Sequence, residues 1–453
     1  MGGEWQSARL LDLYDVSSGL SKPAKDFGSG FPFLAFKDVF NNAFVPSNLS
    51  QLVQSNEKEQ VKCSVLYGDV FLTRTSETMD ELGMSSVALK DYPNATFNGF
   101  TKRLRPKESN DLVPEYVGYY LRSPMFRQTM LSFSTMSTRA SLNNEMIGKL
   151  AIEFPAREQQ RVIASYLKSL DDKIELNRQI NTTLESMAQA LFKSWFVDFD
   201  PVIDNALAAG NDIPDALQAK AAKRQALGDK RKPLPDGLQQ QFPDRFVFTE
   251  EMGWVPEGWE VGSIYELAEV VYGAPFSSKQ FNEDRQGRPI IRIRDLKTGT
   301  PQMWSEELHP KATLITGGDV VVGMDAEFRP VLWSGEDGYL NQRLFLARPR
   351  ADYINSFYVQ FSLSPLLALE ELAQVGTTVA HLGKKDIDKF VTLKASHSAI
   401  SAFSKITGPM HGRLVGNYKE LRVLVKIRDT LLPKLLSGEL RIPEAEKQLA
   451  EAL

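Results

Sequence analysis

Residues 30–39 read GFPFLAFKDV, and residues 287–296 read GRPIIRIRDL, so one local pattern occurs twice in this 453-residue chain. In both stretches a Gly-x-Pro turn leads into an apolar strand that ends in a basic residue, an aspartate and an aliphatic residue. Self-similarity over such a distance indicates a duplicated structural unit. We therefore interpret the chain as two copies of one domain.

The similarity extends outward from these stretches in a shared order. The matched residues are Trp5, Val16 and Gly19 with Trp259, Val270 and Gly273, Gly68-Asp69 with Gly318-Asp319, Leu104-Arg105-Pro106 with Ala347-Arg348-Pro349, Ser123-Pro124 with Ser364-Pro365, and Ser137-Thr138 with Thr377-Thr378. The offset falls from 254 at Trp5 to 240 at Ser137, so loop lengths differ while the strand signals persist. Each match is weak alone, and their common order carries the inference.

Each copy is followed by a long amphipathic segment. Apolar residues recur with four-three spacing at Ile163, Leu167, Leu170, Ile174, Leu184, Ala188 and Leu191, and again at Phe403, Met410, Leu414, Leu421, Leu424 and Leu431. This spacing predicts two helices of roughly forty residues, about 60 Å at 1.5 Å per residue, that pack as a coiled coil. For either segment alone, an ordinary amphipathic core helix is the alternative.

Two polar features interrupt this pattern. Asn177 and Asn417 fall at equivalent seam positions, where a buried polar pair would fix the helix register at some cost in stability. Gly408-Pro409 predicts a kink or a late start of the second helix.

The predicted fold class is α+β. Two similar mixed α/β domains are each expected to be followed by a long helix, and the helices to pack as an antiparallel coiled coil with pseudo-twofold symmetry. The predicted boundaries are a first domain at 1–155, a central helix at 156–200, a linker at 201–257, a second domain at 258–395, and a C-terminal helix at 396–453. Within the linker, residues 216–227 are expected to be able to form a helix, and the basic run at 230–232 is interpreted as linker.

Composition excludes several classes of protein. The chain contains 42% hydrophobic and 24% charged residues, typical of a globular protein, and no stretch is long and apolar enough to span a membrane. We therefore expect a cytoplasmic location. Cys63 is the only cysteine, and the four histidines show no metal-ligand spacing, so neither a disulfide framework nor a metal site is expected.

Charge alone does not identify a partner. The net charge of -4 is unusual for a nucleic-acid-binding surface, although basic runs occur at 102–107 and 285–294. A single run of this kind is most simply a solvated face. No phosphate-binding loop, amino-methyltransferase segment or nucleophile elbow occurs, so we expect the chain to have no catalytic site of its own.

Several segments resemble a known family. Residues 158–177 and 191–196 resemble the central conserved region of type I restriction specificity subunits, and residues 428–440 resemble the distal one. Residues 323–328 and 341–343 are similar to segments of target-recognition domains. The resemblance covers nearly the whole chain and is most specific at the helices.

The resemblance implies a division of labour. One specificity subunit binds a bipartite double-stranded DNA target and joins two modification subunits, which methylate adenine with S-adenosylmethionine. It also recruits two restriction subunits, which translocate and cut DNA with ATP and Mg²⁺. No cofactor is expected on this chain. Exposed residues of the first helix, such as Glu175, Arg178 and Gln179, are candidate docking positions for these subunits.

Arginine, asparagine and glutamine side chains commonly read base edges, and lysine side chains and backbone amides hold phosphates. We predict the DNA contacts on this basis. They are Lys37, Arg74, Arg103, Arg105, Thr138, Arg139 and Asn143 in the first copy, and Arg292, Arg294, Arg343, Thr378, His381 and Lys384 in the second. Any one of these residues is equally well an ordinary surface charge. Two other functions stay open: a non-catalytic coiled-coil adaptor that joins two protein-binding domains, and a self-contained nuclease-methyltransferase, which the missing motifs disfavour.

Overall fold

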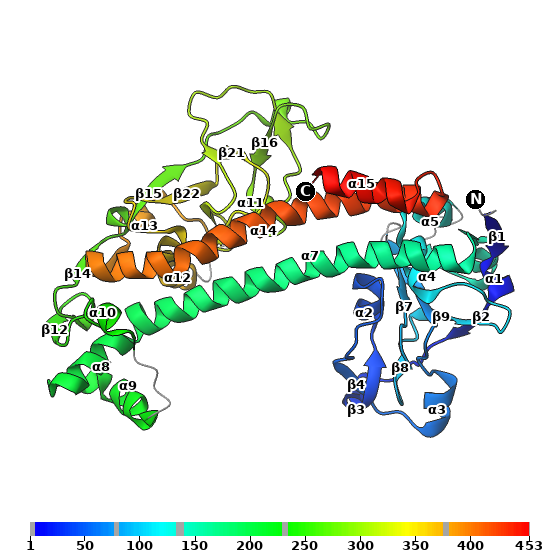
Figure 1. Ribbon diagram of the computed structural model, residues 1–453, viewed down its shortest axis with the longest axis horizontal. Helices are drawn as coiled ribbons and strands as arrows, with labels where there is room; N and C mark the ends of the chain where they lie inside the picture. Colours follow the sequence, from blue (N-terminus) through cyan, green and yellow to red (C-terminus); the bar gives the residue numbers. More distant parts are fainter. Residues whose placement is uncertain (1–4, 77–80, 133–139, 229–233, 375–379, 453) are drawn as a thin grey trace. The chain divides into compact units, whose positions relative to one another are not determined.

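The computed structural model describes residues 5–76, 81–132, 140–228, 234–374 and 380–452 (Figure 1). The chain divides into two compact units. Unit 1 consists of Met1–Ile174 and Val423–Leu453, and unit 2 consists of Glu175–Arg422. Two long helices, α7 (Arg157–Phe192) and α14 (His397–Ser437), contribute residues to both units.

Unit 1 is built around a four-stranded antiparallel sheet. Its strands, in spatial order, are β2 (Tyr14–Ser18), β9 (Thr101–Pro106), β5 (Val70–Thr73) and β7 (Ser85–Val87). A three-stranded mixed sheet has the order β4 (Gln51–Val53), β3 (Phe27–Leu34) and β8 (Thr96–Phe97), with β3 and β8 parallel. Two antiparallel pairs complete the unit: β1 (Gln6–Arg9) with β11 (Ala151–Phe154), and β6 (Thr75–Ser76) with β10 (Ala140–Ser141).

Unit 2 repeats this plan. Its four-stranded antiparallel sheet has the order β15 (Ala268–Tyr272), β22 (Leu344–Pro349), β19 (Val320–Gly323) and β20 (Pro330–Leu332). The mixed sheet has the order β17 (Trp304–Ser305), β16 (Arg288–Ile291), β21 (Gly338–Leu340) and β18 (Leu314–Ile315), with β16 and β21 parallel. β14 (Glu260–Ser263) pairs with β23 (Val391–Lys394), and β12 (Phe246–Thr249) pairs with β13 (Gly253–Pro256).

Helices cover the sheets of each unit. Unit 1 contains α1 (Leu10–Leu13), α2 (Phe36–Asn41), α3 (Glu57–Lys62), α4 (Pro114–Arg122), α5 (Pro124–Ser132), α6 (Asn144–Lys149) and α15 (Ile442–Ala452). Unit 2 contains α8 (Asp200–Ala209), α9 (Asp215–Ala226), α10 (Asp236–Gln239), α11 (Ile293–Leu296), α12 (Ser356–Ala373) and α13 (Lys384–Ile387). α4 packs on β7 in unit 1, and α12 packs on β19, β20 and β22 in unit 2 (Figure 1).

The two long helices pack together in antiparallel fashion, and their contacts are cross-helix polar pairs as well as apolar ones. In unit 1, Arg428 Nη1 of α14 lies 2.9 Å from Asp171 Oδ1 of α7. In unit 2, Asn417 Nδ2 donates to Asn181 Oδ1 over 2.7 Å. Residues later in α7 lie opposite residues earlier in α14, as antiparallel packing requires. The predicted fold class is therefore confirmed, with two mixed-sheet domains and two packed long helices.

The start of α14 corrects one of the alternatives offered by the sequence. The helix begins at His397 and continues through Gly408 and Pro409, so a late helix start at these residues is wrong. A proline ring leaves the carbonyl four residues earlier without its helical donor. That carbonyl belongs to Lys405, and both Lys405 and Pro409 are exposed, so water can satisfy it. The solvent-facing position explains why the helix tolerates the proline.

The segment predicted as a linker contains three helices and a pair of strands. Val202 of α8, Leu217 of α9 and Phe242, which follows α10, are buried in the main apolar core of unit 2. Asp204 of α8 forms an ion pair with Arg224 of α9 and is almost buried. The segment is thus a packed part of unit 2.

Candidate nucleic-acid interface

An ion pair occurs at equivalent positions in the four-stranded sheets of both units. It joins an aspartate just before one central strand to an arginine on the neighbouring central strand. In unit 1, Arg105 of β9 contacts Asp69 through Nη2–Oδ2 at 2.6 Å and Nε–Oδ1 at 2.8 Å. In unit 2, Arg348 of β22 contacts Asp319 through Nη2–Oδ2 at 2.9 Å and Nε–Oδ1 at 3.3 Å. In each pair the hydrogen bond to the carboxylate raises the pKa of the arginine. Arg105 therefore braces the sheet of unit 1.

Two more residues nominated as DNA contacts make structural contacts in unit 1. Arg103 is 7% exposed, donates from Nη1 to the Ser64 carbonyl at 2.7 Å, and lies against the Phe97 ring. Burial lowers the pKa of this guanidinium. Asn143 is the N-cap of α6, where its Oδ1 accepts a hydrogen bond from the Met146 amide at 2.8 Å.

Lys37 and Arg294 occupy equivalent exposed positions, on α2 of unit 1 and α11 of unit 2. Lys37 follows β3 along the chain, and Arg294 follows β16. The next residue in each case is an aspartate that caps the helix. Asp38 accepts a hydrogen bond from the Ala35 amide at 3.1 Å, and Asp295 accepts one from the Arg292 amide at 2.9 Å. The side chain of Arg292 itself is only 16% exposed and lies 3.7 Å from Asp295.

A junction of three chain segments forms beyond the end of β19 in unit 2. Met324 donates its amide to the Arg343 carbonyl at 2.9 Å, and Leu382 donates its amide to the Met324 carbonyl at 2.8 Å. Asp325 and His381 face each other as an antiparallel bridge. Arg343 has a φ of 75°, a left-handed conformation that is uncommon for a non-glycine residue.

Side chains converge at this junction. His381 Nδ1 lies 2.7 Å from Asp325 Oδ1, and Arg343 Nη1 lies 3.4 Å from the same oxygen and 3.2 Å from His381 Nδ1. A carboxylate only accepts hydrogen bonds, so both Nδ1–H and Nη1–H donate to it. The Nε2 edge of the imidazole then lies on the side away from Asp325. About half of the His381 and Arg343 side-chain surface is exposed.

The same backbone junction occurs in unit 1 with different side chains. Arg74 donates its amide to the Phe100 carbonyl at 2.8 Å, and Leu142 donates its amide to the Arg74 carbonyl at 2.8 Å. Thr75 and Ser141 pair as β6 and β10. Arg74 is exposed, and Phe100 is 63% exposed, which is unusual for a phenyl ring. The sequence analysis nominated Arg74 but not Phe100, because basic and amide side chains are the usual DNA contacts.

The remaining nominated DNA contacts are distributed as follows. Lys384 is the first residue of α13 and lies 3.3 Å from Asp388, with most of its side chain exposed. Thr138, Arg139 and Thr378 lie outside the described residues. Among the described residues, no group of three or more histidine, cysteine or carboxylate side chains is arranged to hold a metal ion.

Asn177 and Asn417 are both buried between the long helices within unit 2, but they do not pair with each other. Asn177 Nδ2 donates to Glu420 Oε2 at 2.8 Å, whereas Asn417 Nδ2 donates to Asn181 Oδ1 at 2.7 Å. Each amide thus spans the helix pair one turn apart. Their role in fixing helix register stays a prediction.

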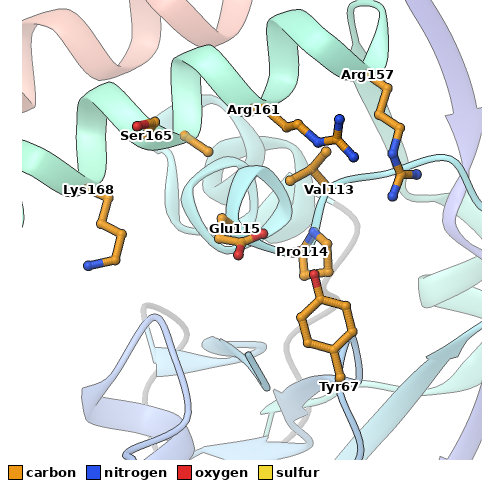
Figure 2. Close-up of a pocket in the computed structure, with 9 residues that line it drawn as sticks. Tyr67, Val113, Pro114, Glu115, Arg157, Arg161, Ser165 and Lys168 are labelled. Carbon is orange, nitrogen blue, oxygen red and sulfur yellow. The ribbon is translucent and has the colours of Figure 1, made fainter. Parts of the chain in front are cut away.

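A cavity of about 340 Å³ opens in unit 1 beside the start of α7. Figure 2 shows Arg157 and Arg161 extending from α7 on the side of Tyr67 and Pro114. Arg157 lies 2.8 Å from Asp111, and Arg161 lies 3.3 Å from Glu158. Because these cations have acidic partners within unit 1, we do not assign the cavity to phosphate binding.

None of the helices in the described part of the chain combines the length and apolar character needed to cross a membrane.

Comparison with protein families gives matches over most of the chain. Residues 2–186 and 256–391, which contain both sheet-bearing domains, match the family described as type I restriction modification DNA specificity domain. The two separate matches agree with the duplication visible in the sheets.

Individual relatives match over nearly their whole length. The specificity subunit of the type I restriction enzyme HindI from Haemophilus influenzae is 28% identical, with 94% of this chain and 98% of the relative covered. The MjaIX specificity subunit from Methanocaldococcus jannaschii is 23% identical, with 97% and 94% covered. A crystal structure of a type I restriction-modification S subunit from M. genitalium has a similar fold, with a TM-score of 0.52, 13% identity and 96% of both chains covered.

Proposed function

Because this chain belongs to the type I restriction modification DNA specificity family and is the DNA specificity subunit of such a system, non-catalytic in itself, we propose that each unit reads one half of a bipartite target. An unread stretch of duplex separates the two halves. The proposed reading domains are residues 1–155 and 258–395. Residues 156–200 and 396–453 act as the spacer, and residues 201–257 connect the two copies.

A single observation carries this proposal: the two units share a scaffold and differ in the side chains that it exposes. The ion pairs Asp69–Arg105 and Asp319–Arg348 repeat, whereas the exposed residues at the two junctions do not. A retained scaffold with altered exposed groups is expected of two readers of unlike sequences. Protein-binding adaptor domains have no such requirement for hydrogen-bonding and methyl-contacting groups that match base edges.

The proposed contacts divide by chemistry. Lys37 and Arg294, exposed at equivalent positions, suit the phosphate backbone, which every sequence shares. Arg74, Arg343 and His381 suit base edges, with Lys384 nearby in sequence to His381. Thr138, Arg139 and Thr378 remain nominated from the sequence alone. Arg103, Arg105 and Asn143 are assigned structural roles, because their polar groups are bonded within unit 1.

Partner subunits supply the chemistry in this proposal. Two modification subunits with S-adenosylmethionine methylate adenine, and two restriction subunits with ATP and Mg²⁺ cleave DNA. The net charge of -4 supports this division, since a chain with a net negative charge benefits from phosphate contacts made by partners. Glu175, Arg178 and Gln179, exposed on α7, are proposed docking positions.

The test is to assemble the full chain with its modification subunits and map methylated adenines on random-sequence duplex DNA. We expect a split motif with a constant gap. A single uninterrupted motif would refute two-domain reading. The chain without partners, incubated with S-adenosylmethionine and DNA, should transfer no methyl groups. An adaptor that does not touch DNA would give a complex whose affinity for DNA is unchanged by mutation of Lys37 and Arg294.

A further inference from the structure

At the three-segment junction the two units keep the same backbone hydrogen bonds and a buried leucine, Leu142 or Leu382, whereas the exposed side chains differ. In unit 2 the exchanged positions hold Asp325, Arg343 and His381, and in unit 1 they hold Thr75, Phe100 and Ser141. The repeat preserves polar groups at other positions, such as the helix-capping aspartates Asp38 and Asp295. A preserved backbone with different exposed side chains indicates that the backbone supports the junction in both units, while the side chains differ in what they bind.

We infer that this junction is the base-reading position of each unit, and that Asp325 is the positioning residue that holds Arg343 and His381 in unit 2. This inference rests on the proposed function and adds the residues that give each half-site its sequence. Asp325 does not itself meet the DNA in this assignment, because a carboxylate facing phosphates would be repelled.

The geometry explains why a carboxylate stands between Arg343 and His381. Asp325 Oδ1 accepts hydrogen bonds from His381 Nδ1 at 2.7 Å and Arg343 Nη1 at 3.4 Å. These contacts fix the imidazole with its proton on Nδ1, which leaves Nε2 directed away from the carboxylate. They also tie down one end of the guanidinium while its side chain stays 56% exposed. A flexible side chain that is already oriented loses less conformational entropy on binding.

The exposed groups define the chemistry that each junction recognises. Arginine most often reads guanine in the major groove, through its O6 and N7 acceptors, so the junction of unit 2 should recognise a G·C pair. The junction of unit 1 presents the Phe100 ring instead, which suits apolar contact with the methyl group of thymine, with Arg74 alongside. The two half-sites should therefore differ in composition at these positions.

The experiment uses the full chain assembled with its modification subunits and a set of duplexes that carry the mapped target with each position changed in turn. Arg343→Ala should reduce discrimination about 10- to 100-fold at a G·C position of one half-site. Phe100→Ala should relax a position in the other half-site only. In each variant, the unaffected half-site reports that the protein is folded and bound.

The role of Asp325 has its own test. Asp325→Asn should relax the same position as Arg343→Ala, and Asp325→Glu should restore part of the discrimination. Glu327→Gln, which removes a neighbouring exposed carboxylate paired with Arg329, is the matched control and should leave the motif unchanged. A merely structural role for Asp325 would lower methylation of all duplexes equally.

Three outcomes would overturn the inference. Uniform loss across all duplexes would make Arg343 a phosphate contact, and relaxation of both half-sites by one variant would break the assignment of one junction to one half. An unchanged motif in Asp325→Asn would remove its positioning role. A wild-type motif without two halves is a different failure, since it would overturn the proposed function before any variant is compared.

Discussion

At the scale of single residues, the repeated ion pair offers an internal comparison. The side chain of Asp69 is 1% exposed and that of Asp319 is 15% exposed, while their arginine partners are 29% and 38% exposed. Both carboxylates also accept a backbone amide, from Leu66 and Thr316 respectively. The two pairs therefore make the same contacts at different depths.

We predict that Asp69→Asn destabilises the protein more than Asp319→Asn does. The loss should be about 2 kcal/mol for the deeper pair and about 1 kcal/mol for the shallower pair, because water screens and replaces the shallower one better. Urea unfolding monitored by circular dichroism measures both. Equal losses, or a larger loss for Asp319→Asn, would contradict the burial argument.

His411 predicts a pH dependence within unit 2. Burial is the largest influence on this imidazole and lowers its pKa below 6.5, while its Nε2 lies 3.1 Å from the Gly318 carbonyl. The folded protein thus binds the proton less readily than the unfolded chain. The associated stability is present above pH 6.5 and is lost as the pH falls through the lower, folded-state pKa.

His411→Gln should reduce this loss, since glutamine can donate to the Gly318 carbonyl but does not titrate. Melting temperatures of the wild type and the variant at pH 7.5 and pH 5.5 provide the comparison. The wild type should lose more on acidification than the variant does. Parallel losses would show that His411 has no part in the acid sensitivity.

At the scale of elements, Pro409 is a weak point in a helix of 41 residues. Pro409→Ala restores an amide donor to the Lys405 carbonyl and removes ring strain, so it should stabilise the protein by about 1 to 3 kcal/mol. Because Lys405 and Pro409 are exposed, no core packing changes with them. Lys405→Ala is the control, and thermal unfolding of both variants measures the difference. A destabilised Pro409→Ala would indicate that the helix needs its proline.

The elements also show what could be predicted from sequence. The start of the first long helix at Arg157 and the matched turns at Gly68 and Gly318 followed from periodicity and from repeat order, because both depend on local chemistry. The pairing of Asn417 with Asn181 did not follow, since a seam position does not specify which residue faces it on the partner helix. Packing of the predicted linker through Val202 was missed for a similar reason.

The fold class is confirmed, whereas the DNA-contacting residues stay predictions. Basic residues were nominated by charge, yet Arg105 is neutralised by Asp69, a partner 36 residues away in sequence that only the folded sheet brings near. Asp325 and Phe100 were not nominated, because neither a carboxylate nor a phenyl ring is a usual sign of DNA contact. The shared backbone of the two junctions is a better signal, and it requires coordinates.

At the scale of the whole molecule, helix length should set the gap between half-sites. One heptad inserted after Asn177 in α7, with a second inserted before Glu420 in α14, keeps the apolar seam in phase. Seven helical residues add about 10.5 Å, close to three base pairs at about 3.4 Å each. Methylation mapping should then find both half-sites unchanged and the gap longer by about three base pairs.

Two observations would contradict that prediction. An unchanged gap would mean that the helices do not set the spacing. Altered half-site sequences would mean that the insertion had disturbed the reading domains. A heptad inserted into α7 alone is the control, because it shifts the helices out of register and should abolish site-specific methylation without creating a new gap.

The unlike junctions of the two units have a final consequence. Phe100 in one unit stands where Arg343 stands in the other, so under the proposed base-reading assignment the two ends of the target have different sequences. A target of this kind is asymmetric, because its two half-sites differ in sequence. A subunit bound there would have a defined orientation relative to its site, so the two flanks of the site would be distinguishable.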